Sequence, residues 1–264
     1  MGKLHVFIDG SWLIKVCAPN GILAERFCVP NQFKLDFSKL KDVIYRHIAS
    51  TQPDCTEIGD CYFITSIFDI PANMNTWIGR TVNTRTITQD QLDKTTRNVR
   101  MREDYANRAN TAGFDPQGII RVTLKDWMIQ KLADKKYQEK QVDTTVVALL
   151  VKYAITKPND FFVIVAGDSD ILPAISIAYP EFTQRICWVA NHPDQLNAAH
   201  RQTSFSYFQY SYNIPPLYLH DCVDKISEGV NIYTCPNCHK VFISPTPFAQ
   251  HSRTFCPTCS RQRT

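Results

Sequence analysis

The sequence predicts an α/β fold, a doubly wound and mostly parallel sheet flanked by helices, with a small separate module at the C-terminus. Unbroken apolar runs are the first observation, because they suit strands that are buried on both faces of a parallel sheet. Three such runs span residues 4–8, 161–166 and 185–190. Helical patterns alternate with them, over residues 37–49, 146–154 and 171–178. Strands that alternate with helices are typical of doubly wound folds.

Each element has a local reason in the sequence. In residues 37–49, four apolar side chains recur at steps of three or four and define one face of a helix: Phe37, Leu40, Ile44 and Ile48. Residues 146–154 are apolar almost throughout, as in a helix packed against a sheet. Residues 119–122 predict another strand, whereas residues 124–132 suit a strand or a helix equally. Residues 217–227 are expected to form a last helix.

The composition excludes several classes of protein. The chain has 264 residues, of which 44% are hydrophobic, so it gives no reason to expect disorder. No apolar run approaches the roughly 18–20 residues of a membrane span, and the N-terminus lacks a secretory signal. The formal net charge of +4 permits a polyanionic partner without requiring one. We therefore expect a cytoplasmic protein without a membrane partner.

A polar, basic stretch at residues 70–114 interrupts the apolar pattern. Residues 89–112 contain neither proline nor glycine and predict a charged helix that ends at Gly113. The helix is either a solvated face or a basic arm that grips phosphates, for which Arg97, Arg100 and Arg102 are the candidates. We therefore expect a domain over residues 1–212 that carries this insertion, a linker or helix over 213–230, and a module over 231–264.

The ten cysteines form two groups. Six are scattered in apolar surroundings and predict buried thiols in a reducing compartment: Cys17, Cys28, Cys55, Cys61, Cys187 and Cys222. Four form two Cys-Pro-x-Cys pairs near the C-terminus: Cys235, Cys238, Cys256 and Cys259. Thiolates at this spacing hold one Zn²⁺ ion, and two such pairs complete its tetrahedron. The second group therefore predicts a structural zinc site.

The fourth zinc ligand has two candidates. A four-cysteine ribbon, which the matching pairs favour, uses Cys259, whereas a ββα zinc finger uses His251. About thirty residues cannot build an adequate core, so zinc is expected to supply much of the folding energy of the module. Three arginines make its end basic: Arg253, Arg261 and Arg263. Nucleic-acid binding is the favoured role of the module, and protein contact or a purely structural role stays open.

Four aspartates stand where the elements of such a sheet begin or end. Asp9 ends the first strand, Asp168 and Asp170 follow the strand at 161–166, and Asp143 opens an apolar helix. The carboxyl ends of parallel strands share one edge, so these carboxylates are expected to converge. Carboxylates that crowd together repel one another, and Mg²⁺ or Mn²⁺ relieves the repulsion. Three of them also have a structural explanation, because Asp143 and Asp170 could cap helices and Asp9 could be a turn residue, whereas Asp168 has no comparable one.

These acidic motifs, in this order, resemble the NYN family of PIN-like nucleases. The motifs are VFIDGS from Val6, QVD from Gln141 and VAGDSD from Val165, and the resemblance covers about residues 3–212. It implies a PIN-like α/β fold and a ribonuclease centre with Mg²⁺ or Mn²⁺ at Asp9, Asp143, Asp168 and Asp170. Lys140 matches a position that is often basic in the family. Trp12 departs from the family, which has an asparagine there that Ser11 could replace in part.

The leading hypothesis is a metal-dependent endoribonuclease whose zinc module helps to bind nucleic acid. The expected RNA contacts are Ser11, Lys140, Arg97, Arg100 and Arg102. One alternative is a non-catalytic RNA-binding adaptor with a PIN-like fold, which Trp12 favours. The other is a structure-specific nuclease with DNA as its substrate. The sequence leaves the oligomeric state open, a homodimer included.

Overall fold

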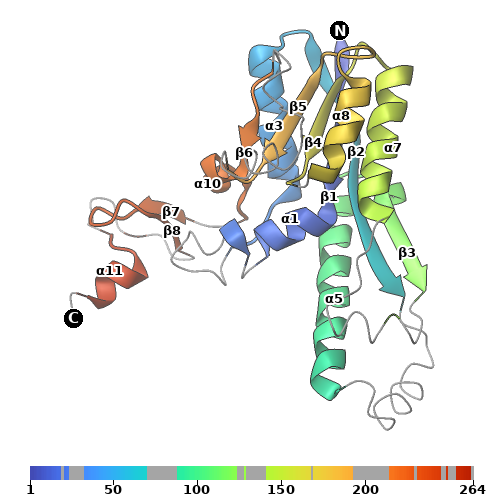
Figure 1. The fold of residues 1–264 in the computed structure, drawn as a ribbon. Coiled ribbons are helices and arrows are strands. Elements are labelled where there is room, and N and C mark those ends of the chain that lie inside the picture. The colour runs from blue at the N-terminus through green and yellow to red at the C-terminus, as the bar shows by residue number, and fades with distance from the viewer. Residues whose placement is uncertain are drawn as a thin grey trace.

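A computed structural model describes most of the chain (Figure 1). The described residues are 1–18, 21–23, 33–69, 88–123, 128, 141–167, 169–192, 214–228, 231–244, 248 and 254–262. Within them lies a six-stranded sheet with the order β3-β2-β1-β4-β5-β6, in which every neighbouring pair is parallel. Its strands are β1 (Gly2–Asp9), β2 (Cys55–Asp69), β3 (Ile119–Thr123), β4 (Phe161–Val165), β5 (Ile186–Ala190) and β6 (Leu217–Tyr218). The predicted parallel α/β architecture is confirmed.

Helices cover both faces of the sheet. One face packs against α1 (Gly10–Cys17), α3 (Phe37–Thr51), α5 (Gln89–Thr111) and α10 (Val223–Ile226). The other face packs against α7 (Gln141–Thr156) and α8 (Leu172–Ala178). Successive strand residues point to opposite faces, so Val6 and Ile8 enter the first core and Phe7 enters the second. Burial on both faces explains why the strand sequences are apolar without alternation.

The apolar stripe of α3 lies where its spacing predicts. Phe37, Leu40, Ile44 and Ile48 are all buried, and Asp36 caps the helix by accepting a hydrogen bond from the Lys39 backbone N–H at 3.0 Å. No helix in the described ranges combines the length and the apolar character that a membrane crossing requires.

Strand β2 is the longest element of the sheet, and the sequence analysis did not identify it. Its first half is polar, with Gly59 and Asp60 interrupting the apolar pattern, and the β1–β2 register shifts between Leu4 and Val6. Asp9 pairs with Ile64, so the last five residues of β2 continue past the end of β1 and pair with β3. The end of β2 therefore forms a wall beside the carboxyl end of β1.

The predicted charged helix is α5, and it connects β2 with β3. It ends before Gly113, whose φ of 83° lies in the left-handed region that glycine adopts without strain. Val99, Tyr105 and Ala109 of α5 are buried in the first core. This part of the helix is thus a crossover that covers the sheet rather than a projecting arm, and Figure 1 shows that α5, β2 and β3 all extend past the end of β1.

Residues 217–227 differ from the expected single helix. They form edge strand β6, a 3-10 turn (Leu219–Asp221) and then α10. The segment is fixed to the start of α3, because the Asp36 N–H donates to the Ile226 carbonyl at 2.8 Å. It therefore adds a sixth strand inside the region that the sequence analysis assigned to a linker.

Two strands and a helix form the C-terminal module. Strands β7 (Asn231–Thr234) and β8 (Val241–Ser244) make an antiparallel hairpin, and α11 (Pro257–Arg261) follows. The second Cys-x-x-Cys pair sits at the start of this helix, with Cys256 at its N-cap position. Figure 1 shows the module beside the sheet domain, on the side of α1 and α10.

Candidate functional site

The centre of the sheet contains a topological switch point. From β1 the chain builds β2 and β3 on one side, and β4, β5 and β6 on the other. Ligands of open parallel sheets bind outside the carboxyl ends of the strands at such a point. Ile8 of β1 is in register with Val165 of β4, so Asp9 and the segment from Gly167 to Asp170 leave the sheet from adjacent strands. Two of the predicted acidic motifs thus begin side by side.

Asp9 is held firmly at this edge. Its carboxylate accepts a hydrogen bond from the Trp12 N–H at 3.0 Å and caps α1, and only 3% of the residue is exposed. A Cβ on Gly10 would lie 2.8 Å from the Ile64 carbonyl oxygen, so glycine lets α1 start close against β2. Asp9 is therefore the N-cap of α1, a local structural role that differs from the turn residue expected as its alternative. Burial of a carboxylate also favours a cation nearby.

The other acidic residues are distributed around the same edge. Helix α7 runs against the strand direction, because Tyr153, near its end, contacts the early β1 residue His5 with ring centroids 4.8 Å apart. Its first turn, with the half-buried Asp143 as third residue, therefore lies toward the carboxyl edge. Asp170 is exposed in a 3-10 turn that precedes α8. Asp168 and Lys140 lie outside the described residues.

The described carboxylates alone do not make a divalent-metal site. Among the described residues, the four paired cysteines are the only group of three or more potential ligands close enough to share an ion. Asp9, Asp143 and Asp170 therefore do not form such a group by themselves. The predicted role of this edge depends on the remaining aspartate, Asp168.

Arg102 brings the basic helix to the carboxyl edge. Its Nη1 donates to the Ser11 hydroxyl at 3.0 Å, to the Thr65 hydroxyl at 3.1 Å and to the Ser66 carbonyl at 3.4 Å. Two predicted RNA contacts, Ser11 and Arg102, are thus joined two residues from Asp9. Thr65 was not predicted from the sequence, because it lies in the part of β2 that continues past the end of β1. Arg97 and Arg100 are exposed farther toward the start of α5.

Two polar atoms are buried next to this edge. The Trp12 indole Nε1 and the Ser66 hydroxyl have no hydrogen-bond partner in the described structure. An unsatisfied buried donor costs about 1–3 kcal/mol. Trp12 is 8% exposed and belongs to the first core, so this side chain is a packing residue.

A second polar cluster lies at the opposite, amino edge of the sheet. The fully buried His5 accepts a hydrogen bond from the Asp60 N–H at Nδ1, 3.0 Å away, so its ring proton is on Nε2, which donates to Asp160 at 2.9 Å. Asp60 also accepts from Lys157 at 2.8 Å and from the Tyr153 hydroxyl at 2.9 Å. Burial lowers the pKa of His5 more than Asp160 raises it. This network joins β1 and β2 to the end of α7 and to Asp160, the residue directly before β4. It was not predicted from the sequence.

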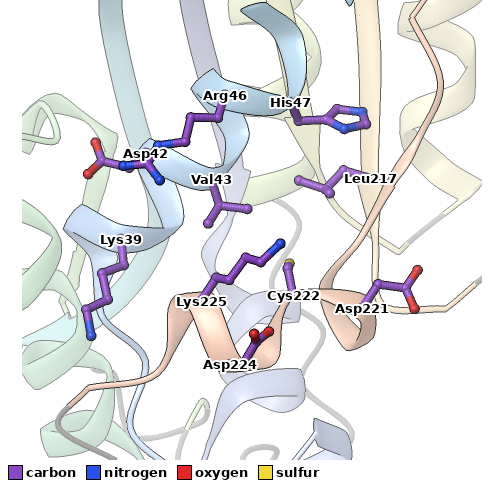
Figure 2. A pocket seen from close by; sticks show the side chains of 10 residues that line it. All are labelled: Lys39, Asp42, Val43, Arg46, His47, Leu217, Asp221, Cys222, Asp224 and Lys225. Carbon is purple, nitrogen blue, oxygen red and sulfur yellow. The ribbon is translucent and has the colours of Figure 1, made fainter. Parts of the chain in front are cut away.

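A hollow of about 660 Å³ lies between α3 and the segment that contains β6 and α10 (Figure 2). Its apolar lining consists of Val43, Leu217 and Cys222. Its charged lining is balanced, with three cations and three aspartates: Lys39, Arg46, Lys225, Asp42, Asp221 and Asp224. None of the predicted catalytic or RNA-binding residues lines it. The balance of charge gives it no preference for an anion, so it is not our candidate site.

The four cysteines of the C-terminal module fit a structural zinc ion. Their sulfur atoms lie within 4.8 Å of one another, and those of Cys238 and Cys256 are 3.7 Å apart. Zn–S bonds of about 2.3 Å in a tetrahedron place the sulfurs about 3.8 Å apart. Cys259 thus belongs to the set, as the four-cysteine alternative requires, while His251 lies outside the described residues.

The backbone around Cys235 favours its thiolate form, whereas the Lys240 N–H lowers the pKa of Cys238 less than burial and hydrogen bonds to the other thiols raise it, to about 11. Burial raises the pKa of Cys235, but hydrogen bonds from the N–H groups of Cys256, Cys238 and Asn237 outweigh this and lower it. A zinc ligand must be deprotonated, so this arrangement prepares the site for the metal. Among the described residues the core of the module consists of cysteines and Phe242, with Tyr233 and Phe255 packed against it, and a metal would add to the stability of so small a core.

The scattered cysteines are confirmed as buried thiols where the structure describes them: Cys17, Cys55, Cys61, Cys187 and Cys222. Burial raises the pKa of Cys187 and of Cys222 to about 12 in each case, which makes both unreactive near neutral pH. Cys28 lies outside the described residues.

Comparisons with known proteins identify no relative. No protein-family model, no curated protein and no solved structure matches the chain. Function must therefore be argued from the arrangement of the residues.

Proposed function

We propose that the protein is a metal-dependent endoribonuclease that hydrolyses RNA at the carboxyl edge of its sheet, and that its zinc module helps to bind the RNA. The observation that carries the proposal is the switch point between β1 and β4. Asp9 is the last residue of β1, and in the sequence the Gly-Asp-Ser-Asp segment follows β4. The resemblance to NYN nucleases assigns the same positions to catalysis.

The proposed metal ligands are Asp9 and Asp168, with Asp143 and Asp170 acting directly or through water. Mg²⁺ and Mn²⁺ suit this donor set, because they prefer carboxylate oxygens and retain several waters. The bound ion would activate a water molecule and offset the charge that develops on the leaving oxygen. The burial of Asp9 supports this role, since a buried carboxylate is stabilised by a cation.

Arg102 is the proposed positioning residue for the RNA strand. It is half-buried against Ser11 and Thr65, so its guanidinium is fixed rather than mobile. A fixed cation beside a carboxylate cluster offsets the repulsion between those carboxylates and a phosphate. Lys140, Arg97 and Arg100 are the further proposed phosphate contacts, and they contribute sequence-independent affinity.

A non-catalytic RNA-binding adaptor is the second candidate, and Trp12 favours it. The indole is packed into the core at a position where the resemblance implies a polar assistant to the metal. The fold and the basic residues would then serve binding without turnover. A nuclease specific for DNA differs from the proposed ribonuclease in its substrate, and from the adaptor in that it cuts.

Cleavage assays on matched RNA and DNA strands with Mg²⁺ or Mn²⁺ test the proposal. We expect RNA to be cut by the wild type and not by an Asp168→Asn, Asp170→Asn double variant. The matched control is Asp221→Asn, Asp224→Asn, which removes two carboxylates from the hollow between α3 and α10. Activity in the control and not in the first variant supports the mechanism. Retained cutting by the first variant overturns it, and RNA binding without cutting by the wild type identifies the adaptor.

A further inference from the structure

The net positive charge of the chain is concentrated in the C-terminal module. Residues 231–264 contain four basic residues and no aspartate or glutamate: Lys240, Arg253, Arg261 and Arg263. The remaining residues balance, because 29 − 4 leaves 25 lysines and arginines against 25 acidic residues. One Zn²⁺ on four thiolates carries a formal charge of −2, so the loaded module keeps a formal +2. The module therefore keeps a net positive charge that attracts a polyanion.

An exposed aromatic ring stands on this basic module. Phe248 is 43% exposed, whereas its neighbour Phe242 is 2% exposed. The Phe248 N–H donates to the Tyr233 hydroxyl at 2.8 Å, and the two rings form a T-shaped contact with centroids 5.0 Å apart. Tyr233 in turn packs against Phe242 on the hairpin. Phe248 is thus held in place by the zinc-stabilised hairpin while much of its surface faces solvent.

Two cations of the same module are also exposed. Lys240 is exposed directly before β8, two residues from Phe242. Arg261 is exposed at the end of α11, which begins at the second cysteine pair. Proteins that bind single strands combine an aromatic ring, on which an unpaired base stacks, with cations that hold the phosphates.

We propose that Phe248, supported by Tyr233, stacks an unpaired base of single-stranded RNA, with Lys240 and Arg261 contacting its phosphates. The inference rests on the proposed function in that it takes RNA as the substrate. Duplex RNA does not fit, because its bases are covered by their neighbours. A protein partner fits less well, because Phe248 is the only large exposed apolar residue among those whose side chains the structure describes in the module. A protein interface needs a larger apolar patch.

Binding measurements test the inference without requiring catalysis. The full chain carrying Asp168→Asn and Asp170→Asn is loaded with zinc and titrated, in the absence of Mg²⁺ and Mn²⁺, into a fluorescein-labelled oligouridine. We expect Phe248→Ala to weaken the Kd about tenfold, in line with base–aromatic stacking. Phe248→Trp should restore the affinity, and Phe248→Leu, which keeps an apolar side chain without a π face, should not. The matched control is Ile155→Ala, which removes an apolar side chain that is 51% exposed on α7.

Zinc content separates stacking from folding. Each variant is expected to retain the zinc stoichiometry of the wild type, since none of them removes a ligand. Equal affinity of Phe248→Ala and Ile155→Ala overturns the inference, as does full affinity of Phe248→Leu or equal loss of affinity for a paired RNA hairpin. Affinity that depends on Phe248, together with a wild-type chain that does not cut RNA, refutes the proposed function and leaves the inference standing. Cleavage of RNA by the wild type, together with an affinity that does not depend on Phe248, overturns the inference and leaves the proposed function standing.

Discussion

Replacement of Arg102 by methionine tests whether this side chain fixes the carboxyl edge of the sheet. Arg102 joins three elements, because its Nη1 lies within hydrogen-bond distance of Ser11 on α1 and of Thr65 and Ser66 on β2, while its own backbone belongs to α5. Methionine keeps an apolar stem of similar length, so the packing of the chain against the helix is largely preserved. The substitution removes the hydrogen bonds and the charge.

The magnitude follows from the geometry. One Nη1 carries two N–H groups, so the two short contacts, at 3.0 and 3.1 Å, are the substantial ones. Hydrogen bonds that involve a charged group contribute about 1.5–3 kcal/mol each. Arg102 is only half-buried, so the lower value applies, and the two bonds together contribute about 3 kcal/mol. The substitution also leaves the fully buried Thr65 hydroxyl without this donor.

Urea unfolding followed by tryptophan fluorescence measures the effect. We expect Arg102→Met to lower the free energy of unfolding by about 3 kcal/mol, and the Tm by about 6–12 °C for a domain of this size. Arg100→Met is the matched control, because Arg100 is exposed two residues away on the same helix. A change within about 0.5 kcal/mol is expected there. Equal midpoints for the two variants would show that Arg102 does not anchor α5 to this edge.

Two further predictions concern pH and zinc. His5, Asp60 and Asp160 all have pKa values below their ordinary ones in the folded state, so unfolding takes up protons and acid destabilises the fold. The urea midpoint should fall as the pH drops below about 6.5, and His5→Gln should flatten this fall; parallel curves would contradict the assignment. Cys259→Ser should abolish stoichiometric zinc binding, measured by mass spectrometry of the metal. Retained zinc would instead identify His251 as the fourth ligand.

The local sequence pattern was enough to predict helices and strands whose apolar residues follow directly from their position in the fold. The stripe of Phe37, Leu40, Ile44 and Ile48 is buried because a helix places such residues on one face. The strand at Phe161–Val165 is apolar at every position because helices cover it on both sides. Gly113 ends α5 because it adopts a positive φ at low cost. In these cases the cause lies within a few residues.

Strand β2 could not be predicted in the same way. Gly59 and Asp60 break its pattern, and both positions are set by His5 on the neighbouring strand. A Cβ on Gly59 would lie 2.6 Å from the His5 ring, and the Asp60 backbone donates to it. The same applies to β6, whose two residues count as a strand only because Val189 and Ala190 pair with them.

The sequence by itself determined the alternation of strands and helices, the two cysteine pairs and the position of each aspartate along the chain. All three follow from the spacing of residues along the chain, because side-chain periodicity and ligand spacing are local properties. Only the tertiary structure decided that β1 and β4 are adjacent, that Arg102 of α5 reaches Ser11 of α1, and that the four sulfurs lie close together. These contacts join residues as many as 157 positions apart, as in the pairing of Leu4 on β1 with Phe161 on β4. Strand pairing and packing, rather than local preference, bring such residues together.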